Sequence, residues 1–274
     1  MRSKQSLLSR FTGILTLGWS NSPGGRLRLR RAVSQSTRHA LRARSRRLPL
    51  ERLRSVAVVS PHPDDETLGC GGTLALLAGS HAEVRVAFVT NGSASHPFHP
   101  SFTPEQIDEM RKAEALTAAG KLGLHQDRVT FVGAPDGKLS GLDGVNSAAM
   151  VSRIAEILKA ASPDAVFLPL RRDGSTDHEA SFLLVQLALQ KTGLRPRIFE
   201  FPIWAWRNPL LQLRPMLTSS AVWRSDISAV LDRKLAAIGA YASQIRPLPP
   251  DTVPVLSPEF TSEFSHSEEF FFER

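Results

Sequence analysis

The sequence has few of the features that would place it outside a reducing compartment or inside a membrane. Its 274 residues include one cysteine, Cys70, so an intramolecular disulfide is excluded and a reducing cytoplasm is the expected location. The apolar run at residues 11–20 is too short to span a bilayer, and no later run approaches the required ~20 residues. A secretory signal is not expected either, because no small-residue cleavage site follows a proper apolar segment.

Acidic residues are almost absent from the first 54 positions. This segment carries 14 Lys and Arg against one acid, Glu51, for a net charge of +13. The other 220 residues carry 20 bases and 25 acids, for a net charge of −5. Because the positive charge is confined to the head of the chain, and no basic patch with interleaved aromatics follows it, we expect no nucleic-acid partner.

The Arg-rich extension at residues 1–54 has three interpretations. Its composition is typical of a solvated, partly disordered segment. Clustered Arg side chains could instead make peripheral contact with an anionic membrane surface, where each is worth about 1 kcal/mol. An Arg-rich, acid-poor targeting peptide is the third interpretation. The sequence leaves all three open.

From residue 55 onward, strand-like and helix-like segments alternate. The apolar runs Ser55–Ser60 and 84–90 lack polar alternation, as expected of strands that helices cover on both faces. Such βαβ units predict a Rossmann-like α/β fold, with a mostly parallel sheet and helices on both faces, in one domain over residues 55–274. The part after residue 202 is less regular. The expected strands are 55–60, 84–90, 129–132, 165–168 and 197–201, and the expected helices are 67–80, 103–122, 145–161, 178–191 and 228–243.

The motif P-H-P-D-D-E at residues 61–66 directly follows the first expected strand. In parallel sheets, functional residues gather beyond the carboxyl ends of the strands. His62 and Asp65 are spaced so that both can point at one centre, and imidazole and carboxylate are normal ligands of zinc. Asp64 lies between them. A structural alternative is that one aspartate caps the next helix, but this leaves His62 and the other acid without a role.

A third metal ligand should come from the end of another strand. The segment D-G-S-T-D-H at residues 173–178 follows the expected strand at 165–168. His178 is the best candidate there, and Asp177 could orient an imidazole from behind. Three histidines in loops could also reach the site, although their spacing does not require it: His96, His99 and His266.

These motifs resemble those of the LmbE-like, PIG-L family of zinc-dependent N-deacetylases. The resemblance covers about residues 56–244, and it is most specific at P-H-P-D-D-E-T-L-G-C-G-G, residues 61–72. The weaker matches are T-N-G at 90–92, R-x-x-E at Arg111 and Glu114, P-D-G at 135–137, and Lys234 followed by Y-x-S-Q at 241–244.

The resemblance implies an LmbE-like fold and removal of the N-acetyl group from an N-acetylglucosamine-type amino sugar or its conjugate, with release of acetate. It implies that zinc is bound by His62, Asp65 and His178, that Asp64 is the general base, and that Arg111 and Asp136 help to hold the sugar. The chain departs from the family at Ser175, where a histidine is common. The resemblance implies that such a histidine assists the tetrahedral intermediate or the leaving group, and Ser175 does not carry an imidazole for this role.

Three other functions are alternatives to deacetylation. A metal-binding but catalytically impaired homologue, acting as a binding module, would account for Ser175. A nucleotide-binding protein is disfavoured, because residues 69–72 lack the G-x-G-x-x-G spacing. A two-metal phosphoesterase would need more carboxylates. The acetylated substrate itself stays open among free sugars, conjugates, lipid-linked sugars and polysaccharides.

Overall fold

The computed structural model describes residues 23–207 and 218–273 of the chain. The chain divides into two compact units, residues 1–43 and 44–274. Helix α2 (Pro23–Arg44) covers the described part of the first unit, so this part of the expected extension is helical. The expectation of disorder for residues 1–22 lies outside the described residues. None of the described helices is long and apolar enough to cross a membrane.

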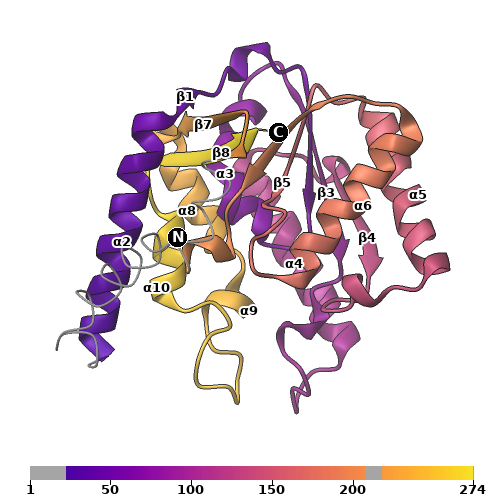
Figure 1. Ribbon diagram of the computed structural model, residues 1–274. Coiled ribbons are helices and arrows are strands. Elements are labelled where there is room, and N and C mark those ends of the chain that lie inside the picture. Colours follow the sequence, from indigo (N-terminus) through magenta and orange to yellow (C-terminus); the bar gives the residue numbers. More distant parts are fainter. Residues whose placement is uncertain (1–22, 208–217, 274) are drawn as a thin grey trace, which may run out of the picture. The chain divides into compact units, whose positions relative to one another are not determined.

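A sheet of eight strands lies at the centre of the second unit (Figure 1). The strands are β1 (Arg46–Arg47), β2 (Ser55–Ser60), β3 (Glu83–Thr90), β4 (Val129–Ala134), β5 (Ala165–Pro169), β6 (Arg197–Phe201), β7 (Ala221–Asp226) and β8 (Glu268–Glu273). Their order across the sheet is β1-β7-β8-β6-β5-β2-β3-β4. Neighbours are parallel, except that β8 runs antiparallel to both β6 and β7. The prediction of a mostly parallel α/β sheet is therefore confirmed.

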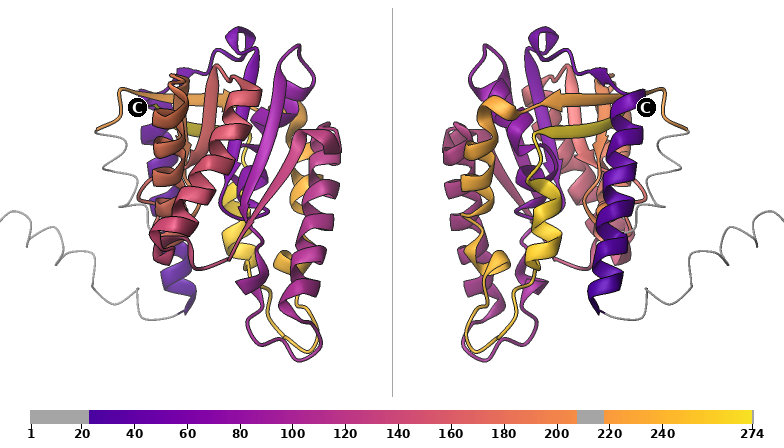
Figure 2. Two further views of the ribbon diagram at one scale, coloured as in Figure 1. Left: turned by 90° about the vertical axis from the view of Figure 1, so that its right-hand side faces the viewer. Right: turned by 90° about the vertical axis from the view of Figure 1, so that its left-hand side faces the viewer.

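Helices cover both faces of this sheet (Figure 2). On one face, α5 (Gly144–Ala161) packs against α6 (Thr176–Thr192). On the other face, α3 (Asp65–Ala78) and α4 (Pro104–Leu122) pack against α8 (Leu231–Ile238). This arrangement is the Rossmann-like one expected from the alternation of strand and helix patterns.

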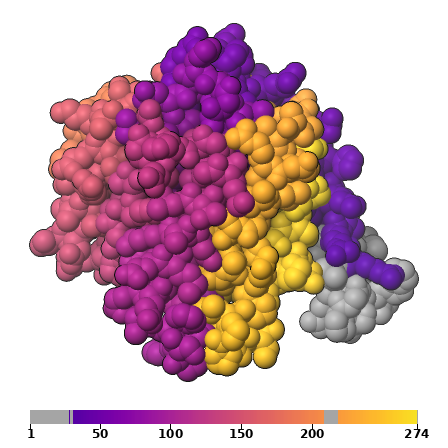
Figure 3. Space-filling model, turned by 180° about the vertical axis from the view of Figure 1, so that it is seen from behind, coloured from indigo at the N-terminus to yellow at the C-terminus, as the bar shows by residue number. Residues whose placement is uncertain are grey.

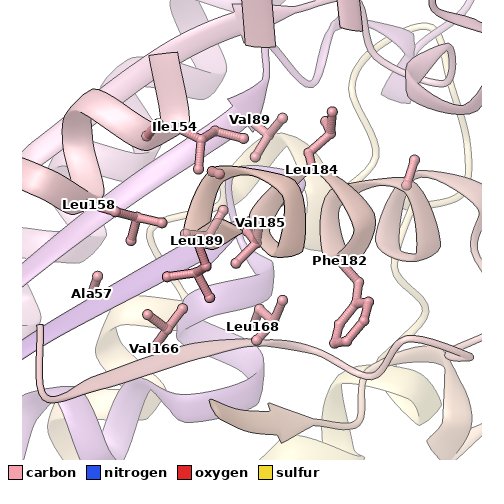
Figure 4. Packing of buried hydrophobic residues seen from close by; sticks show 14 of the residues in the cluster. Ala57, Val89, Ile154, Leu158, Val166, Leu168, Phe182, Leu184, Val185 and Leu189 are labelled. Atoms are coloured by element: carbon pink, nitrogen blue, oxygen red, sulfur yellow. The ribbon is translucent and has the colours of Figure 1, made fainter. Parts of the chain in front are cut away.

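An aliphatic core joins α5 and α6 to the sheet (Figure 4). Val59 of β2 and Val166 of β5 meet Leu158 of α5 and Val185 of α6, and each of these side chains is at most 1% exposed. Burial of each such side chain stabilises the fold by roughly 1.5–3 kcal/mol. The same packing holds β2 and β5 side by side, which matters because the two functional motifs follow these strands.

Helix α3 is interrupted at Cys70, whose φ of −141° is not helical. Buried side chains from distant parts of the chain satisfy the backbone groups around the interruption. Nζ of Lys234 donates to the carbonyl of Leu68 at 2.9 Å, and Glu269 accepts two backbone N–H bonds, each of 2.8 Å, from the second half of the helix. Lys234 and Glu269 also pair with each other at 2.7 Å. An ion pair between α8 and β8 thus supports the helix that carries the first motif.

The structure differs from the sequence-based prediction at both ends of the second unit. The predicted helix at 228–243 is divided into a 3-10 turn, α8 and the short helix α9 (Ala242–Ile245). Strands β7 and β8, which the pattern did not indicate, extend the sheet. Because β1 pairs with β7, the second unit begins at residue 44, whereas the composition placed the boundary after residue 54.

Candidate active site

The turn between β2 and α3 carries the P-H-P-D-D-E motif. Asp64 has a φ of 143°, a region that residues with a side chain rarely occupy. Its backbone N–H donates to Oε2 of the buried Glu66 at 3.1 Å, and the carbonyl of Pro63 accepts from the guanidinium of Arg111. The Asp64 side chain makes no capping hydrogen bond to α3, so the interpretation of Asp64 as a helix cap is wrong.

Three ligand-type side chains converge at the carboxyl ends of β2 and β5. Oδ2 of Asp65 lies 3.1 Å from Nδ1 of His62 and 3.2 Å from Nε2 of His178. One donor atom of each residue lies within 4.8 Å of the other two. Since β2 and β5 are paired in parallel, the turns that follow them open at the same edge of the sheet.

This group of residues could hold a metal ion. Two imidazoles and a carboxylate, with a further position left for water, are a known ligand set of catalytic zinc. Nε2 of His178 is buried and makes no hydrogen bond to the described residues, although it lies 3.2 Å from the Asp65 carboxylate in an ion pair. A bound cation could take this nitrogen and the Asp65 carboxylate as ligands together. The donor set and this nitrogen therefore both fit zinc.

A carboxylate that the sequence analysis missed lies behind His178. Oδ2 of Asp173 is 2.8 Å from Nδ1 of His178, and both side chains are fully buried. A carboxylate in this position fixes the orientation of an imidazole and makes it a more basic ligand. In the sequence, Asp173 is the first residue of the D-G-S-T-D-H segment, but nothing there indicates that it orients His178.

Two further carboxylates lie behind His62. Its Nε2 is 3.3 Å from Oδ2 of Asp177 and 3.1 Å from Oδ1 of Asp136. Asp177 also accepts backbone N–H bonds from Gly137 at 2.7 Å and Leu139 at 3.1 Å. These bonds connect the loop after β4 to the start of α6, so Asp177 orders that loop as well as contacting the imidazole.

Burial and charge act in opposite directions on the proton affinities of these residues. Burial disfavours the charged form of His178, but the nearby carboxylates of Asp65 and Asp173 outweigh it and raise the pKa of His178 to about 9. Burial also opposes the charge of His62, yet the three carboxylates around it raise its pKa well above the ordinary value. Burial would raise the pKa of Asp65, but the imidazolium of His178 holds it far below its usual range.

Asp64 lies beside the ligand group and has a different partner. Its Oδ2 is 3.2 Å from Nη2 of Arg111. Burial raises the pKa of Asp64 to about 6, and the guanidinium of Arg111 limits the rise. A carboxylate whose pKa is close to neutrality can both accept and return a proton at physiological pH.

A cavity of about 260 Å³ opens onto these groups. His62, Asp64 and Asp65 line one part of its wall. Another part is apolar and comes from the less regular C-terminal region, where Trp204 stacks on Phe260 with ring centroids 4.8 Å apart. The segment with the weakest sequence pattern therefore helps to enclose the cavity.

The two residues that the resemblance assigns to sugar binding, Arg111 and Asp136, also line the cavity. Arg111 is 1% exposed, and its Nε and Nη1 atoms have no hydrogen-bond partner in the part of the chain that the structure describes. Asp136 accepts the N–H of Ala94 at 2.8 Å. A buried guanidinium with unused donors beside a small cavity is suited to bind a polar group of a ligand.

Ser175 stands where the family commonly has a histidine. Among the described residues that line the cavity, the one histidine is His62, so no other histidine replaces the missing one. Ser175 is half-buried before the first turn of α6, where its side chain makes no capping hydrogen bond. His96 and His99 line a neighbouring groove, and His266 is exposed.

Two of the weaker motifs meet behind Asp64. The hydroxyl of Tyr241 donates to Oε1 of Glu66 at 2.6 Å. Glu114 accepts two bonds of 2.7 Å from the N–H and the hydroxyl of Ser243. Burial raises the pKa of Glu66 to about 7, although its hydroxyl hydrogen bonds oppose the rise. The R-x-x-E and Y-x-S-Q motifs thus support the turn that presents Asp64, a role for which the sequence contains no local signal.

Comparisons with known proteins agree with this geometry. Residues 57–189 match the family described as PIG-L: GlcNAc-PI de-N-acetylase. The chain is 29% identical over 204 residues to the probable N-acetyl-alpha-D-glucosaminyl L-malate deacetylase 2 of Bacillus cereus, with 73% of this chain and 87% of that protein covered. It is 25% identical over 266 residues to the 1D-myo-inositol 2-acetamido-2-deoxy-alpha-D-glucopyranoside deacetylase of Rhodococcus opacus, with 79% and 90% covered.

A solved structure extends the similarity to three dimensions. The conserved protein TT1542 from Thermus thermophilus has a TM-score of 0.54 and 31% identity, with 70% of this chain and 80% of that chain covered. Both curated relatives are named as deacetylases. The matched segment contains the P-H-P-D-D-E turn, Arg111, Asp136 and His178. This chain belongs to the PIG-L, or LmbE-like, family.

Proposed function

We propose that this protein is a zinc-dependent hydrolase that removes the N-acetyl group from an N-acetylglucosamine-type amino sugar or its conjugate and releases acetate. The observation that carries the proposal is the convergence of His62, Asp65 and His178 on one centre, with Asp64 beside it at the cavity wall. The deacetylase activity named for the curated relatives points in the same direction.

The metal would be held by His62, Asp65 and His178. When bound, zinc would polarise a carbonyl and lower the pKa of a water molecule to near 7. Asp173 and Asp177 keep the two imidazoles in orientation through their second ring nitrogens. The ligand side chains are therefore positioned before substrate arrives.

Asp64 is the general base in this proposal. Its carboxylate takes a proton from the attacking water and later returns it to the departing amine, because an amine is a poor leaving group without that proton. The strained backbone at Asp64 and its ion pair with Arg111 keep the carboxylate at the cavity wall. The pKa of about 6 suits both transfers near neutral pH.

The sugar would bind in the cavity through Arg111 and Asp136. The unpartnered donors of Arg111 can bond to hydroxyl or carbonyl oxygens, and Asp136 can accept from hydroxyls. The stacked rings of Trp204 and Phe260 offer an apolar surface to the C–H face of a sugar.

Acetate release from N-acetylglucosamine and N,N'-diacetylchitobiose, measured with zinc-loaded protein, tests the function. Asp64→Asn is expected to keep zinc and to lose turnover by roughly 10²–10⁴-fold, the usual worth of a positioned acid–base group. His178→Ala is expected to lose most of the zinc. Asp127→Asn, at an exposed carboxylate, serves as the control and should change neither quantity. Substantial activity in Asp64→Asn would show that another group takes the proton.

One observation favours a second candidate, a catalytically impaired homologue that binds its ligand without hydrolysis. Ser175 stands where the family commonly has a histidine, and no described histidine replaces it at the cavity. Tight zinc binding together with no acetate release from any N-acetylated sugar would favour this second candidate. Measurable turnover would exclude it.

The place of action is a separate proposal. We place the protein in the cytoplasm because its single cysteine, Cys70, is buried and free, so the fold depends on no disulfide. Peripheral membrane contact through the basic segment at residues 1–54 remains a hypothesis that vesicle binding can test.

A further inference from the structure

A second hollow borders the catalytic cavity. It is a groove of about 760 Å³ that lies between the loop after β3 and the loop after β4. Ala94 and Asp136 line both the groove and the cavity, and the 2.8 Å hydrogen bond between them lies at the shared border. A ligand that reaches across this border occupies both hollows.

Six of the sixteen residues that line the groove carry apolar rings. They belong to four prolines and two phenylalanines. Besides two histidines, the ionisable residues of the described lining are one acid, Asp136, and one base, Lys138. One lysine beside one aspartate offers little for a phosphate or another strongly charged group. The apolar rings are those of Pro97, Phe98, Pro100, Phe102, Pro104 and Pro135.

Phe98 is the most exposed of these rings. Its side chain is as open to solvent as in an extended peptide, and its backbone φ is 59°. A phenylalanine can bury 150–250 Å² of surface in a contact, so an exposed one at a groove wall favours an apolar ligand.

The loop that carries Phe98 is held in place by its neighbours. Nε2 of His99 lies 3.3 Å from the carbonyl oxygen of Leu248, and the His99 ring lies 5.1 Å from that of Phe102. The loop after β3 and the loop after α9 lie side by side at one end of the second unit (Figure 3). The groove is therefore formed without a ligand, as is usual for small-molecule sites.

The volumes of the two hollows indicate which part of a conjugate each could hold. Sites for complete small-molecule ligands usually measure about 300–1,000 Å³. The cavity at the metal group, at about 260 Å³, is small for a whole conjugate, while the groove falls inside this range. If a single sugar ring occupies the cavity, the groove can hold the group that is attached to the sugar.

We propose that this groove binds an apolar aglycone, an aliphatic or aromatic group joined to the amino sugar, and that the preferred substrate is an amphiphilic N-acetylglucosamine conjugate. The proposal rests on the proposed function for the sugar end. The assignment of the aglycone site rests on the groove alone, so an experiment can contradict either assignment without the other.

A series of N-acetylglucosamine glycosides with methyl, butyl and octyl groups tests the proposal on the zinc-loaded full chain, below the micelle concentration of each. We expect kcat/KM to rise about ten-fold or more from methyl to octyl, because each fully buried methylene favours binding about four-fold. Phe98→Ser should remove most of this rise. Val145→Ser, which removes another exposed apolar side chain at the start of α5, is the matched control and should retain it.

Binding of octyl glucoside to the metal-free full chain gives a second readout. Calorimetry is expected to show binding with a negative change in heat capacity, weakened by Phe98→Ser and unchanged by Val145→Ser. Equal kcat/KM across the alkyl series without octyl binding would overturn the proposal, as would a gain with longer chitooligosaccharides in place of longer alkyl groups. If octyl glucoside binds through Phe98 but no glycoside releases acetate, the groove is correct and the proposed function is wrong.

Discussion

Nδ1 of His178 lies 2.8 Å from Oδ2 of Asp173, and neither side chain is exposed to solvent. Asp173 is in turn held by the backbone N–H groups of residues 203–205, at 2.8 to 3.0 Å. With Nδ1 engaged, Nε2 of His178 is left for Asp65 and for a metal ion. The carboxylate at the start of the D-G-S-T-D-H segment thus sets the orientation of the imidazole at its end.

We therefore predict that Asp173→Asn weakens zinc binding by about 10–100-fold, the usual effect of removing a carboxylate behind a ligand histidine. Competition with a chelator measures the affinity, and circular dichroism checks that the fold is retained. Asp127→Asn is the control at an exposed site. Equal zinc affinity in Asp173→Asn and the wild-type chain would contradict the orienting role.

The stability of the metal-free protein should fall as pH rises from about 6.5 to about 9. His178 holds its proton more tightly in the folded chain, with a pKa of about 9, than in the unfolded chain, with the ordinary value of 6.5. Its contribution is therefore complete below pH 6.5 and is lost as pH rises through 9. Thermal unfolding at several pH values measures this.

Two comparisons isolate the cause of that pH dependence. Zinc binding needs unprotonated imidazoles, so zinc should bind more tightly at higher pH and should release protons on binding. His125→Ala, which removes an exposed histidine, should keep the pH dependence of the metal-free protein, whereas His178→Ala should reduce it. The same slope in His178→Ala and wild type would assign the effect to another group.

The buried pair of Lys234 and Glu269 should be essential for stability. Lys234→Met leaves the Glu269 carboxylate buried without its charge partner, which typically destabilises a fold by about 3–5 kcal/mol. Lys112→Met breaks the more exposed pair with Asp108 on α4, and it should change the free energy of unfolding by less than about 1 kcal/mol. Urea unfolding compares the two variants, and similar values would show that the buried pair is dispensable.

Two N-terminal truncations should distinguish the contribution of the basic extension from that of strand β1. A chain that begins at residue 44 retains β1 and is expected to fold and bind zinc. A chain that begins at residue 55 loses β1. It also loses the hydrogen bond from the N–H of Leu48 to the carbonyl of Arg224 and the two from the Arg224 guanidinium to Ser45, so it should be less stable. Equal thermal stability of the two would show that β1 contributes nothing. The chain that begins at residue 44 has lost nine of the 14 Lys and Arg of the basic segment, so most of the salt-sensitive binding to anionic vesicles should already be lost in it.

Ser175→His should raise turnover if the missing histidine limits catalysis. A donor to a developing oxyanion is typically worth about 10²–10³ in rate, so a gain of about ten-fold or more is expected at unchanged zinc content. Ser175→Ala is the control and should stay within about two-fold of the wild type. A large loss in Ser175→Ala would instead identify the serine hydroxyl as the donor.

The sequence by itself determined the local units and the edge at which they meet. An apolar strand followed at once by P-H-P-D-D-E, and another followed by D-G-S-T-D-H, suffice to predict that His62, Asp65 and His178 approach one another. Parallel strands all end at the same edge of a sheet, so this follows from chain direction alone. The donor atoms do lie within 4.8 Å of one another.

Only the tertiary structure decided what surrounds those atoms. Tyr241 reaches Glu66 across 175 positions of sequence, and Lys234 reaches Leu68 across 166. Likewise β8 enters the sheet between β6 and β7, and Trp204 meets Phe260 at the cavity wall. Local periodicity records which face of a segment is buried but not which distant segment covers it. The pKa values of the site arise from that covering, because only the complete fold excludes water from the carboxylates and imidazoles.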